Sequence, residues 1–332
     1  MDQLLMAVST IVIGVFGCVA YFFFSNIALD RIFPPTGDHA GRNINWATAI
    51  RPWLFLFPAL AILGLYLVYP VISTAWLSLN SAGGDEFVGL ANYTWLAQDA
   101  KFQESLVNNM LWLAFVPAAS TFCGLVAAGL TDRIKWGATA QSLIFMPMAI
   151  SFVGATVIWK FVYDYRGENQ GEQIGLLNAL VQSIGFDAQA WITVPFWNNF
   201  FLMIILVWIQ TGFAMVILSA ALRGISEETI EAAFLDGATP MQVFFKIKIP
   251  QIWGTIAVVW TTITVTVLKV FDIVFAMTNG QWGTQVLANL MYDWMFRGTP
   301  DFGRGSAIVM VIMLLVTPIM AWNISNARKE MR

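Results

Sequence analysis

Seven apolar stretches, each long enough to cross a lipid bilayer, dominate this sequence of 332 residues. A transmembrane helix needs about 20 consecutive apolar residues, because the hydrocarbon core is about 30 Å thick. Only 11% of the residues are charged, whereas a soluble domain carries about a quarter. The sequence therefore predicts an all-α membrane protein, a polytopic bundle of about seven transmembrane helices. The predicted spans lie near residues 4–24, 53–79, 106–130, 141–163, 196–222, 252–277 and 306–325.

The first stretch is expected to stay in the protein as a span and not to act as a cleaved signal peptide. Its start, Met1-Asp2-Gln3, carries no basic residue. No small-residue cleavage site follows Phe22-Phe23-Phe24, and a signal peptide needs both features.

Lys and Arg residues are distributed unevenly between the two sides of the predicted spans. Cytoplasmic loops are enriched in these residues, so the asymmetry predicts an N-terminus outside and a C-terminus in the cytoplasm. The richer side has Arg31, Arg42, Arg51, Arg133, Lys135, Arg223, Lys246, Lys248, Arg328, Lys329 and Arg332. The poorer side has Lys101, Arg166, Arg297 and Arg304.

Several classes of function find little support in the residues. The two cysteines lie in apolar runs and the single histidine, His39, lies in a polar loop. No catalytic constellation or metal-ligand set can be assembled from them, and a net charge of −3 gives no reason to expect nucleic acid as a partner. No phosphate-binding G-x-x-x-x-G-K-[ST] loop occurs. We therefore predict no catalytic, metal or cofactor residues in this chain.

The segment between the fifth and sixth spans, residues 226–250, has the signals of two short helices around a tight turn. Ser226 suits an N-cap and Gly237 a left-handed position after the first helix. Thr239-Pro240 suits the start of a second helix, and Pro250 its end. A helix of about ten residues is marginal alone, so we expect this one to dock in a groove on a partner. An ordinary loop between spans is the alternative.

The same segment resembles the EAA loop of binding-protein-dependent ABC importer permeases. The family pattern is Glu-Ala-Ala, three residues, Gly, nine residues and Ile-x-Leu-Pro. Here Glu231-Ala232-Ala233, Gly237 and Ile247-x-Ile249-Pro250 keep that spacing, with Ile249 in place of Leu. Asp236 belongs to a "DGA" that is also common in the family. Stretches such as "DFGRGSAIVMVIMLLV" resemble the MalF-type sugar-permease branch, and the longer N-terminus resembles the permeases of α-glucoside systems.

The resemblance implies a type I permease core of six spans in residues 52–332, with an extra transmembrane helix and a cytoplasmic linker in residues 1–51. The EAA loop would be a coupling helix seated on a cytoplasmic ATPase subunit. Glu231 would make a polar contact there, Ala232 and Ala233 would allow close packing, and Gly237, after Asp236, would allow the turn. ATP and Mg would be bound by the partner ATPase subunits, not by this chain.

The implied partners are a second related permease, two copies of the ATPase and an extracytoplasmic sugar-binding protein. The implied location is a bacterial inner membrane. The sequence departs from the family pattern in four places: Ser226 stands where Pro is common, Gln281-Trp282 replaces Gly-Pro, the first span is extra, and the loop around 166–173 is longer.

Polar residues inside the fifth and sixth spans are candidates for a substrate path. Sugars bind through amides, hydroxyls and charges, with aromatic faces against their C–H patches, and Gln210, Phe213, Thr266 and Lys269 could supply these groups. MalF-type permeases hold sugar near mid-membrane on the spans that flank the EAA loop. The alternative is that the threonines bond their own helix and that Lys269 pairs with Asp272 at i, i+3.

The expected substrate is an α-glucoside or another di- or oligosaccharide. A different neutral polar solute, such as a polyol or glucosylglycerol, is the first alternative. An ion-coupled secondary transporter is the second, although such proteins tend to have internal repeats around buried ionisable groups.

Overall fold

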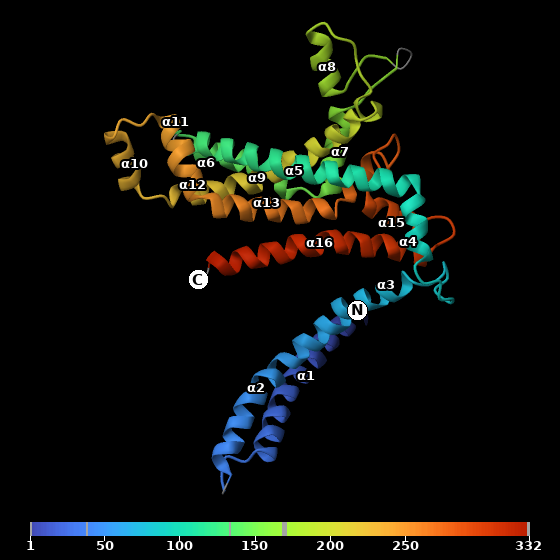
Figure 1. The fold of residues 1–332 in the computed structure, drawn as a ribbon, viewed down its shortest axis with the longest axis vertical. Coiled ribbons are helices and arrows are strands. Elements are labelled where there is room, and N and C mark those ends of the chain that lie inside the picture. The colour runs from blue at the N-terminus through green and yellow to red at the C-terminus, as the bar shows by residue number, and fades with distance from the viewer. Residues whose placement is uncertain (1, 38, 133, 168–170, 331–332) are drawn as a thin grey trace. The chain divides into compact units, whose positions relative to one another are not determined.

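The computed structural model describes residues 2–37, 39–132, 134–167 and 171–330, and in them helices account for nearly all regular structure (Figure 1). One isolated antiparallel bridge joins Asn80 to Phe87 in the described part. The chain divides into two compact units, Met1–Ser73 and Thr74–Arg332. Arg133 and Arg332, which entered the charge comparison, lie outside the described residues.

The first unit is a hairpin of two long helices, α1 (Asp2–Ile32) and α2 (Ala40–Leu63). Helix α2 continues through a π-helical turn, η1 (Gly64–Val68), into α3 (Tyr69–Leu77). The rings of Phe22 and Phe55 stack at 5.1 Å between centroids, and the Tyr21 hydroxyl donates to the Leu54 carbonyl at 2.9 Å. The position expected to separate linker from core, residue 51, lies inside α2.

The second unit is built on α5 (Ala100–Thr131) and α9 (Trp197–Arg223), which pack along one another. Gly124 of α5 makes this possible, because a Cβ there would lie 2.4 Å from the Ala214 Cβ. Gly212 of α9 likewise allows α6 (Gly137–Phe145) to approach, because a Cβ there would lie 2.7 Å from the Ile144 carbonyl oxygen. The other main elements are α4 (Ala91–Gln98), α13 (Trp253–Leu268), α14 (Asp272–Met277), α15 (Leu287–Phe296) and α16 (Phe302–Glu330).

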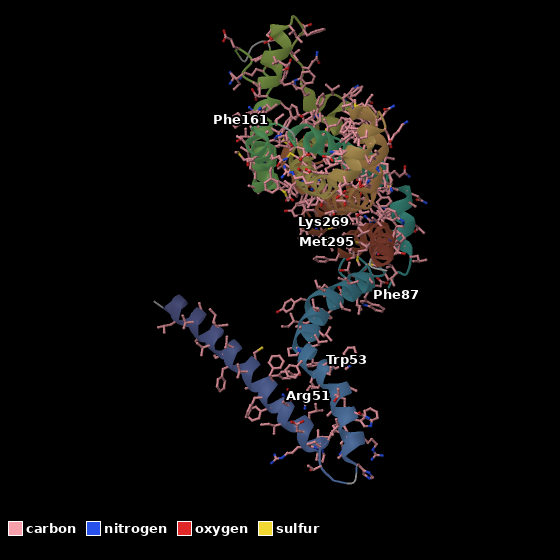
Figure 2. The ribbon with its side chains drawn as sticks, turned by 90° about the vertical axis from the view of Figure 1, so that its left-hand side faces the viewer. Arg51, Trp53, Phe87, Phe161, Lys269 and Met295 are labelled. Carbon is pink, nitrogen blue, oxygen red and sulfur yellow. The ribbon has the colours of Figure 1, made fainter. Side chains whose placement is uncertain are left out.

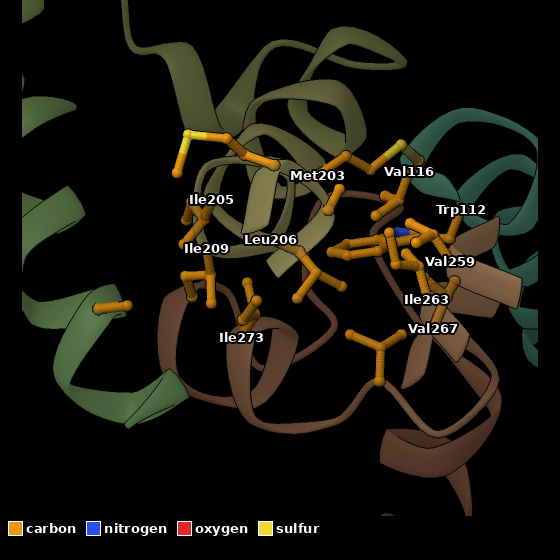
Figure 3. Close-up of a cluster of buried hydrophobic side chains, with 14 of the residues drawn as sticks. Trp112, Val116, Met203, Ile205, Leu206, Ile209, Val259, Ile263, Val267 and Ile273 are labelled. Atoms are coloured by element: carbon orange, nitrogen blue, oxygen red, sulfur yellow. The ribbon is translucent and has the colours of Figure 1, made fainter. Parts of the chain in front are cut away.

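The core of this unit lies where α5, α9 and α13 meet (Figure 3). Trp112 of α5 is fully buried against Leu206 of α9 and Ile263 of α13, members of one continuous apolar cluster. Each of the three helices buries large apolar side chains on the face that it turns to the other two. This burial fixes how each helix is rotated about its own axis.

Asparagines of α5 and α9 hold the loop that follows α14. Asn108 and Asn199 both donate to the Gly283 carbonyl, at 2.9 and 3.1 Å. Asn198 donates to the Trp282 carbonyl at 2.6 Å, and Asn109 accepts from the Leu287 amide at 2.8 Å. Because buried backbone groups must find partners, these four amides let an irregular loop pack against apolar helices.

The prediction of about seven spans is confirmed, but two of the spans are bent. Five helices in the described part are long and apolar enough to cross a membrane, or up to seven if each bent pair is one span. The stretch expected at 141–163 breaks into Gly137–Ala149 and Phe152–Val162, at 106° to each other. The second bend, of 69°, lies between Pro240–Gln251 and Trp253–Leu268. The stretch expected at 252–277 is also interrupted, because its helix ends at Leu268 and resumes at Asp272.

Replacing Gly124 with Val is expected to destabilise the second unit, because the added atoms collide with α9. Overpacking of this kind costs about 1–3 kcal/mol. The measurement is the midpoint of thermal unfolding of the purified protein in detergent, with Gly14→Val in α1 as the matched control, since a Cβ at Gly14 meets nothing within 4 Å. Equal midpoints for the two variants would show that the α5–α9 contact is not as close as described.

Candidate functional site

The segment 226–250 has two capped helices around a glycine turn, as the sequence predicts. Helix α10 (Glu227–Leu235) begins at Ser226, whose hydroxyl accepts from the Thr229 amide. Gly237 has φ +83°, and its amide donates to the Phe234 carbonyl while the Ala238 amide donates to the Ala233 carbonyl, both at 3.0 Å. These paired bonds define a Schellman turn, so the predicted caps and turn are confirmed.

The second helix of the segment restarts at once. Helix α11 (Pro240–Val243) has a full capping box, in which Thr239 and Gln242 each bond the other's backbone amide. A π-helical turn, η4 (Phe244–Lys248), and α12 (Ile249–Gln251) extend it one residue past Pro250. The chain then bends by 69° into α13. We call residues 226–251 the coupling loop, after the role that the sequence resemblance implies.

The coupling loop projects from the end of the bundle where α16 also ends (Figure 1). Glu231, Ala232, Asp236 and Gly237 are exposed, and Leu235 is 89% exposed. Ala233 is buried within the chain itself. Ala232, not Ala233, therefore presents its side chain on the exposed face of the loop, beside Leu235.

The other face of the loop faces the ends of α5 and α9. A hollow of about 300 Å³ separates it from the ends of α5 and α9, and Phe234, Phe244 and Lys248 line the loop side. Beside it, Arg223 at the end of α9 pairs with Asp132 after α5 at 3.0 Å.

Two hollows lie at helix breaks, one where Ala149 is followed by Phe152 and one where α13 ends at Leu268 and α14 begins at Asp272. The larger, about 440 Å³, is lined by Met148, Ile150, Ser151, Phe152, Val153, Ile209, Gln210 and Asp272. The smaller, about 280 Å³, is lined by Phe152, Leu206, Thr266, Lys269, Val270, Phe271, Asp272 and Ile273. Both include Phe152 and Asp272, so they are neighbours. We call the two together the polar path.

Three of the four residues predicted for a substrate path line these hollows. Gln210 is only 8% exposed and its side chain forms no hydrogen bond to the described chain, so its amide is free to face the larger hollow. Thr266 and Lys269 line the smaller hollow. Phe213 lines neither hollow and packs against the buried core. Thr266 also donates to the Thr262 carbonyl at 3.2 Å, the self-bonding considered as the alternative.

The proposed pairing of Lys269 with Asp272 is wrong. No ion pair among the described residues includes either side chain. The i, i+3 argument required a continuous helix, but α13 ends at Leu268. Both charges are therefore left free to face the smaller hollow.

Phe152 and Asp272 line both hollows, yet sequence reasoning did not assign them to the path. The local signal that could have found Phe152 is Ser151, whose hydroxyl caps α7 (Phe152–Val162) by accepting from the Gly154 amide at 3.1 Å. Asp272 is the first residue of α14, where the helix dipole favours a carboxylate.

Comparison with known proteins identifies the class. Residues 120–324 match the family described as "Binding-protein-dependent transport system inner membrane component". The chain belongs to this family and is a multi-pass inner-membrane permease component, so the family that the sequence resembles is confirmed. The fold agrees: a chain of a bacterial alginate ABC transporter, solved with an alginate-bound periplasmic protein, superposes with a TM-score of 0.73 over 86% of this chain and 97% of that one, at 20% identity.

Among individual proteins, the chain is 67% identical to the alpha-glucoside transport system permease protein AglF of Rhizobium meliloti (strain 1021), over 99% of both chains. It is 49% identical to the osmoprotective compounds uptake permease protein GgtC of Synechocystis sp. (strain ATCC 27184 / PCC 6803 / Kazusa), over 83% of this chain and 99% of that one.

Replacing Gly237 with Ala is expected to loosen α10, because a left-handed backbone costs a residue with a Cβ about 1–2 kcal/mol. Hydrogen exchange of the backbone amides of residues 227–238 should become about 5–30 times faster. Gly237→Asn is the matched variant, since Asn tolerates this conformation better, and its exchange should lie between those of the wild type and Gly237→Ala. Unchanged exchange in both variants would contradict the role given to the turn.

Proposed function

We propose that this chain is the permease subunit of an ATP-driven importer for an α-glucoside or a related di- or oligosaccharide. The observation that carries the proposal is the 67% identity to an α-glucoside permease over 99% of both chains, together with family membership. In this proposal the chain forms half of the pathway and a second, related permease forms the rest. An extracytoplasmic sugar-binding protein delivers the substrate, and two copies of a cytoplasmic ATPase bind ATP and Mg.

The coupling loop is proposed to face the cytoplasm and to seat on the ATPase. The charge asymmetry of the loops supports this orientation, with the N-terminus outside and the C-terminus inside. Exposed Glu231 and Asp236 would make polar contacts, Ala232 would allow close approach, and buried Ala233 and the Gly237 turn would hold the shape of the loop.

In this proposal, two helices connect the coupling loop directly to the residues that would contact the substrate. Helix α9 carries Gln210 and leads into the coupling loop, and α13 leaves the loop and carries Thr266 just before its end at Leu268. A displacement of the loop would therefore move two walls of the polar path as rigid bodies, and packed helices transmit such a displacement with little deformation.

The polar path is proposed to hold the sugar during transfer. The Gln210 amide can both donate to and accept from hydroxyls, Lys269 donates, Asp272 accepts, and Phe152 offers a ring face to sugar C–H groups. Helix breaks and free polar groups are costly in a membrane and are typically found where they line a transport route. Phe213, in contrast, would act in packing.

A second candidate substrate is a small osmoprotective compound. The identity of 49% to GgtC over 99% of that chain favours it specifically. The two candidates share the transporter class and the coupling loop, so they differ only in the solute.

Replacing Glu231 with Arg is expected to uncouple transport, because a reversed charge would face the ATPase. Losing about 1.4 kcal/mol of contact energy corresponds to tenfold weaker association, so we expect uptake of radiolabelled maltose by intact cells to fall at least about tenfold. The amount of inserted protein should not change. Glu86→Arg, also at an exposed glutamate but far from the loop in sequence, is the matched control. Normal uptake and normal co-purification of the ATPase with Glu231→Arg would refute the coupling role.

Replacing Gln210 with Leu should weaken sugar transport without affecting assembly. The substitution removes hydrogen bonds worth about 0.5–1.5 kcal/mol each, so sugar-stimulated ATPase activity of the purified transporter should need roughly tenfold more sugar-loaded binding protein or fall in amplitude. Gln98→Leu, on an exposed glutamine at the end of α4, serves as control. If Gln210→Leu and the control behave alike, Gln210 does not contact the sugar.

A further inference from the structure

Between α7 and α9 the chain forms an arm that leaves the bundle sideways. Helix α6 packs along α9, and α7 turns from α6 by 106°. Helix α8 (Leu176–Ser183) continues outward from α7. Figure 1 shows α8 standing clear of the bundle, and Figure 2, turned by 90°, shows the same projection beyond Phe161. Figure 1 shows α8 lying across the direction of α9. Because α9 crosses the membrane, α8 runs roughly along the membrane plane.

The arm is held in a defined conformation by internal hydrogen bonds and close packing. Asn178 of α8 is fully buried and uses its whole side-chain amide. It donates to the carbonyls of Asp164 and Gln189, at 2.9 and 3.1 Å, and accepts from the Gln189 amide and the Trp191 indole, at 3.0 and 2.9 Å. A Cβ at Gly175 would lie 2.2 Å from the Asp164 carbonyl oxygen, so the chain is also closely packed there. The position of α8 relative to α7 is therefore fixed.

One face of α8 is apolar and uncovered. Leu176, Leu180 and Ile184 follow one another at four-residue spacing, which places them on one side of the helix. Their exposed fractions are 65%, 60% and 66%. Exposed Ile174 and Phe186 flank them. The opposite side differs: Asn178 turns inward, and Gln182, two residues from Leu180, is exposed and polar.

We propose that this face of α8 lies in the interfacial region of the lipid bilayer, on the leaflet away from the coupling loop. The apolar surface of α8 continues that of α7, where Val157 and Phe161 are exposed on a membrane element. The arm rejoins the bundle at the start of α9, where exposed Trp197 lies and where tryptophan marks membrane interfaces. The coupling loop follows the other end of α9, which places the arm on the opposite leaflet.

The chemistry of α8 favours lipid over an electrostatic partner. Its sequence, LLNALVQS, contains no charged residue, and Glu172 and Asp187 are exposed beside it. Burial of apolar side chains in the headgroup and acyl boundary therefore holds the arm, as in other interfacial helices. Attachment should not require anionic lipid, because the flanking carboxylates would be repelled by it.

The test is the accessibility of a nitroxide label on α8 in the transporter, purified with its partner subunits and placed in phosphatidylcholine nanodiscs. Single cysteines are introduced by Leu180→Cys and, as matched control, Gln182→Cys. The background is Cys18→Ser with Cys123→Ser, since both native cysteines are free and exposed. Ile184→Cys provides a second label on the apolar face if Leu180→Cys does not assemble.

We expect the label at residue 180 to collide readily with oxygen, which concentrates in lipid, and poorly with a water-soluble nickel chelate. The label at residue 182 should show the reverse preference. Access of both labels to the chelate would place the whole helix in water and overturn the proposal. Low access of the residue 180 label to both reagents would show that a protein surface covers this face, which would overturn it as well. A lipid signal from residue 180 that is absent in phosphatidylcholine and appears only when phosphatidylglycerol is added to the nanodiscs would refute the apolar basis of attachment.

Discussion

The close contact of α5 with α9 is the constraint on which the rest of the second unit depends. It exists because Gly124 admits Ala214 on one side of α9, while Gly212 admits the backbone of α6 on the other. Membrane helices gain little from apolar burial against lipid, so such approaches of small residues supply much of the packing that joins them. Helix α9 is held from both sides, and it is also the helix that carries Gln210 and leads into the coupling loop.

Two helix breaks follow from where the backbone can find partners. Inside a bilayer a chain leaves its helix only where protein or a hydrated hollow satisfies the freed groups. At the first break the Ser151 hydroxyl accepts from the Gly154 amide. At the second, the Lys269 and Asp272 side chains face a hollow that also reaches Phe152. The two breaks lie together, so they bring Gln210, Lys269 and Asp272 to one place, between the helices that flank the coupling loop.

Helix caps, the glycine turn and the number of spans could be predicted from the sequence, but contacts between distant residues could not. Ser226, Thr239 and Gly237 act within three or four residues of themselves, so their caps and turn could be predicted, as could the number of spans from hydropathy. The break at Ile150-Ser151 lies within a stretch whose mean hydropathy predicts one span, and only Pro147 and Ser151 mark it locally. The alternative in which Lys269 pairs with Asp272 assumed that the helix continues between them. Phe213 was predicted to contact the sugar because its side chain is aromatic. The structure shows that this side chain packs against the core, which the local sequence does not reveal. Asn108 and Gly283 are 175 residues apart, and no local pattern links them.

The central claim is that ATP, acting through the coupling loop, drives a sugar through this permease. Its most direct test is uptake of radiolabelled maltose, sucrose and trehalose into proteoliposomes that contain the complete transporter, with the sugar-binding protein outside. The account predicts uptake of at least one of these glucosides only when ATP is supplied on the side of the coupling loop, and no effect of ionophores. Uptake that proceeds without nucleotide and collapses when ionophores dissipate an ion gradient would contradict it.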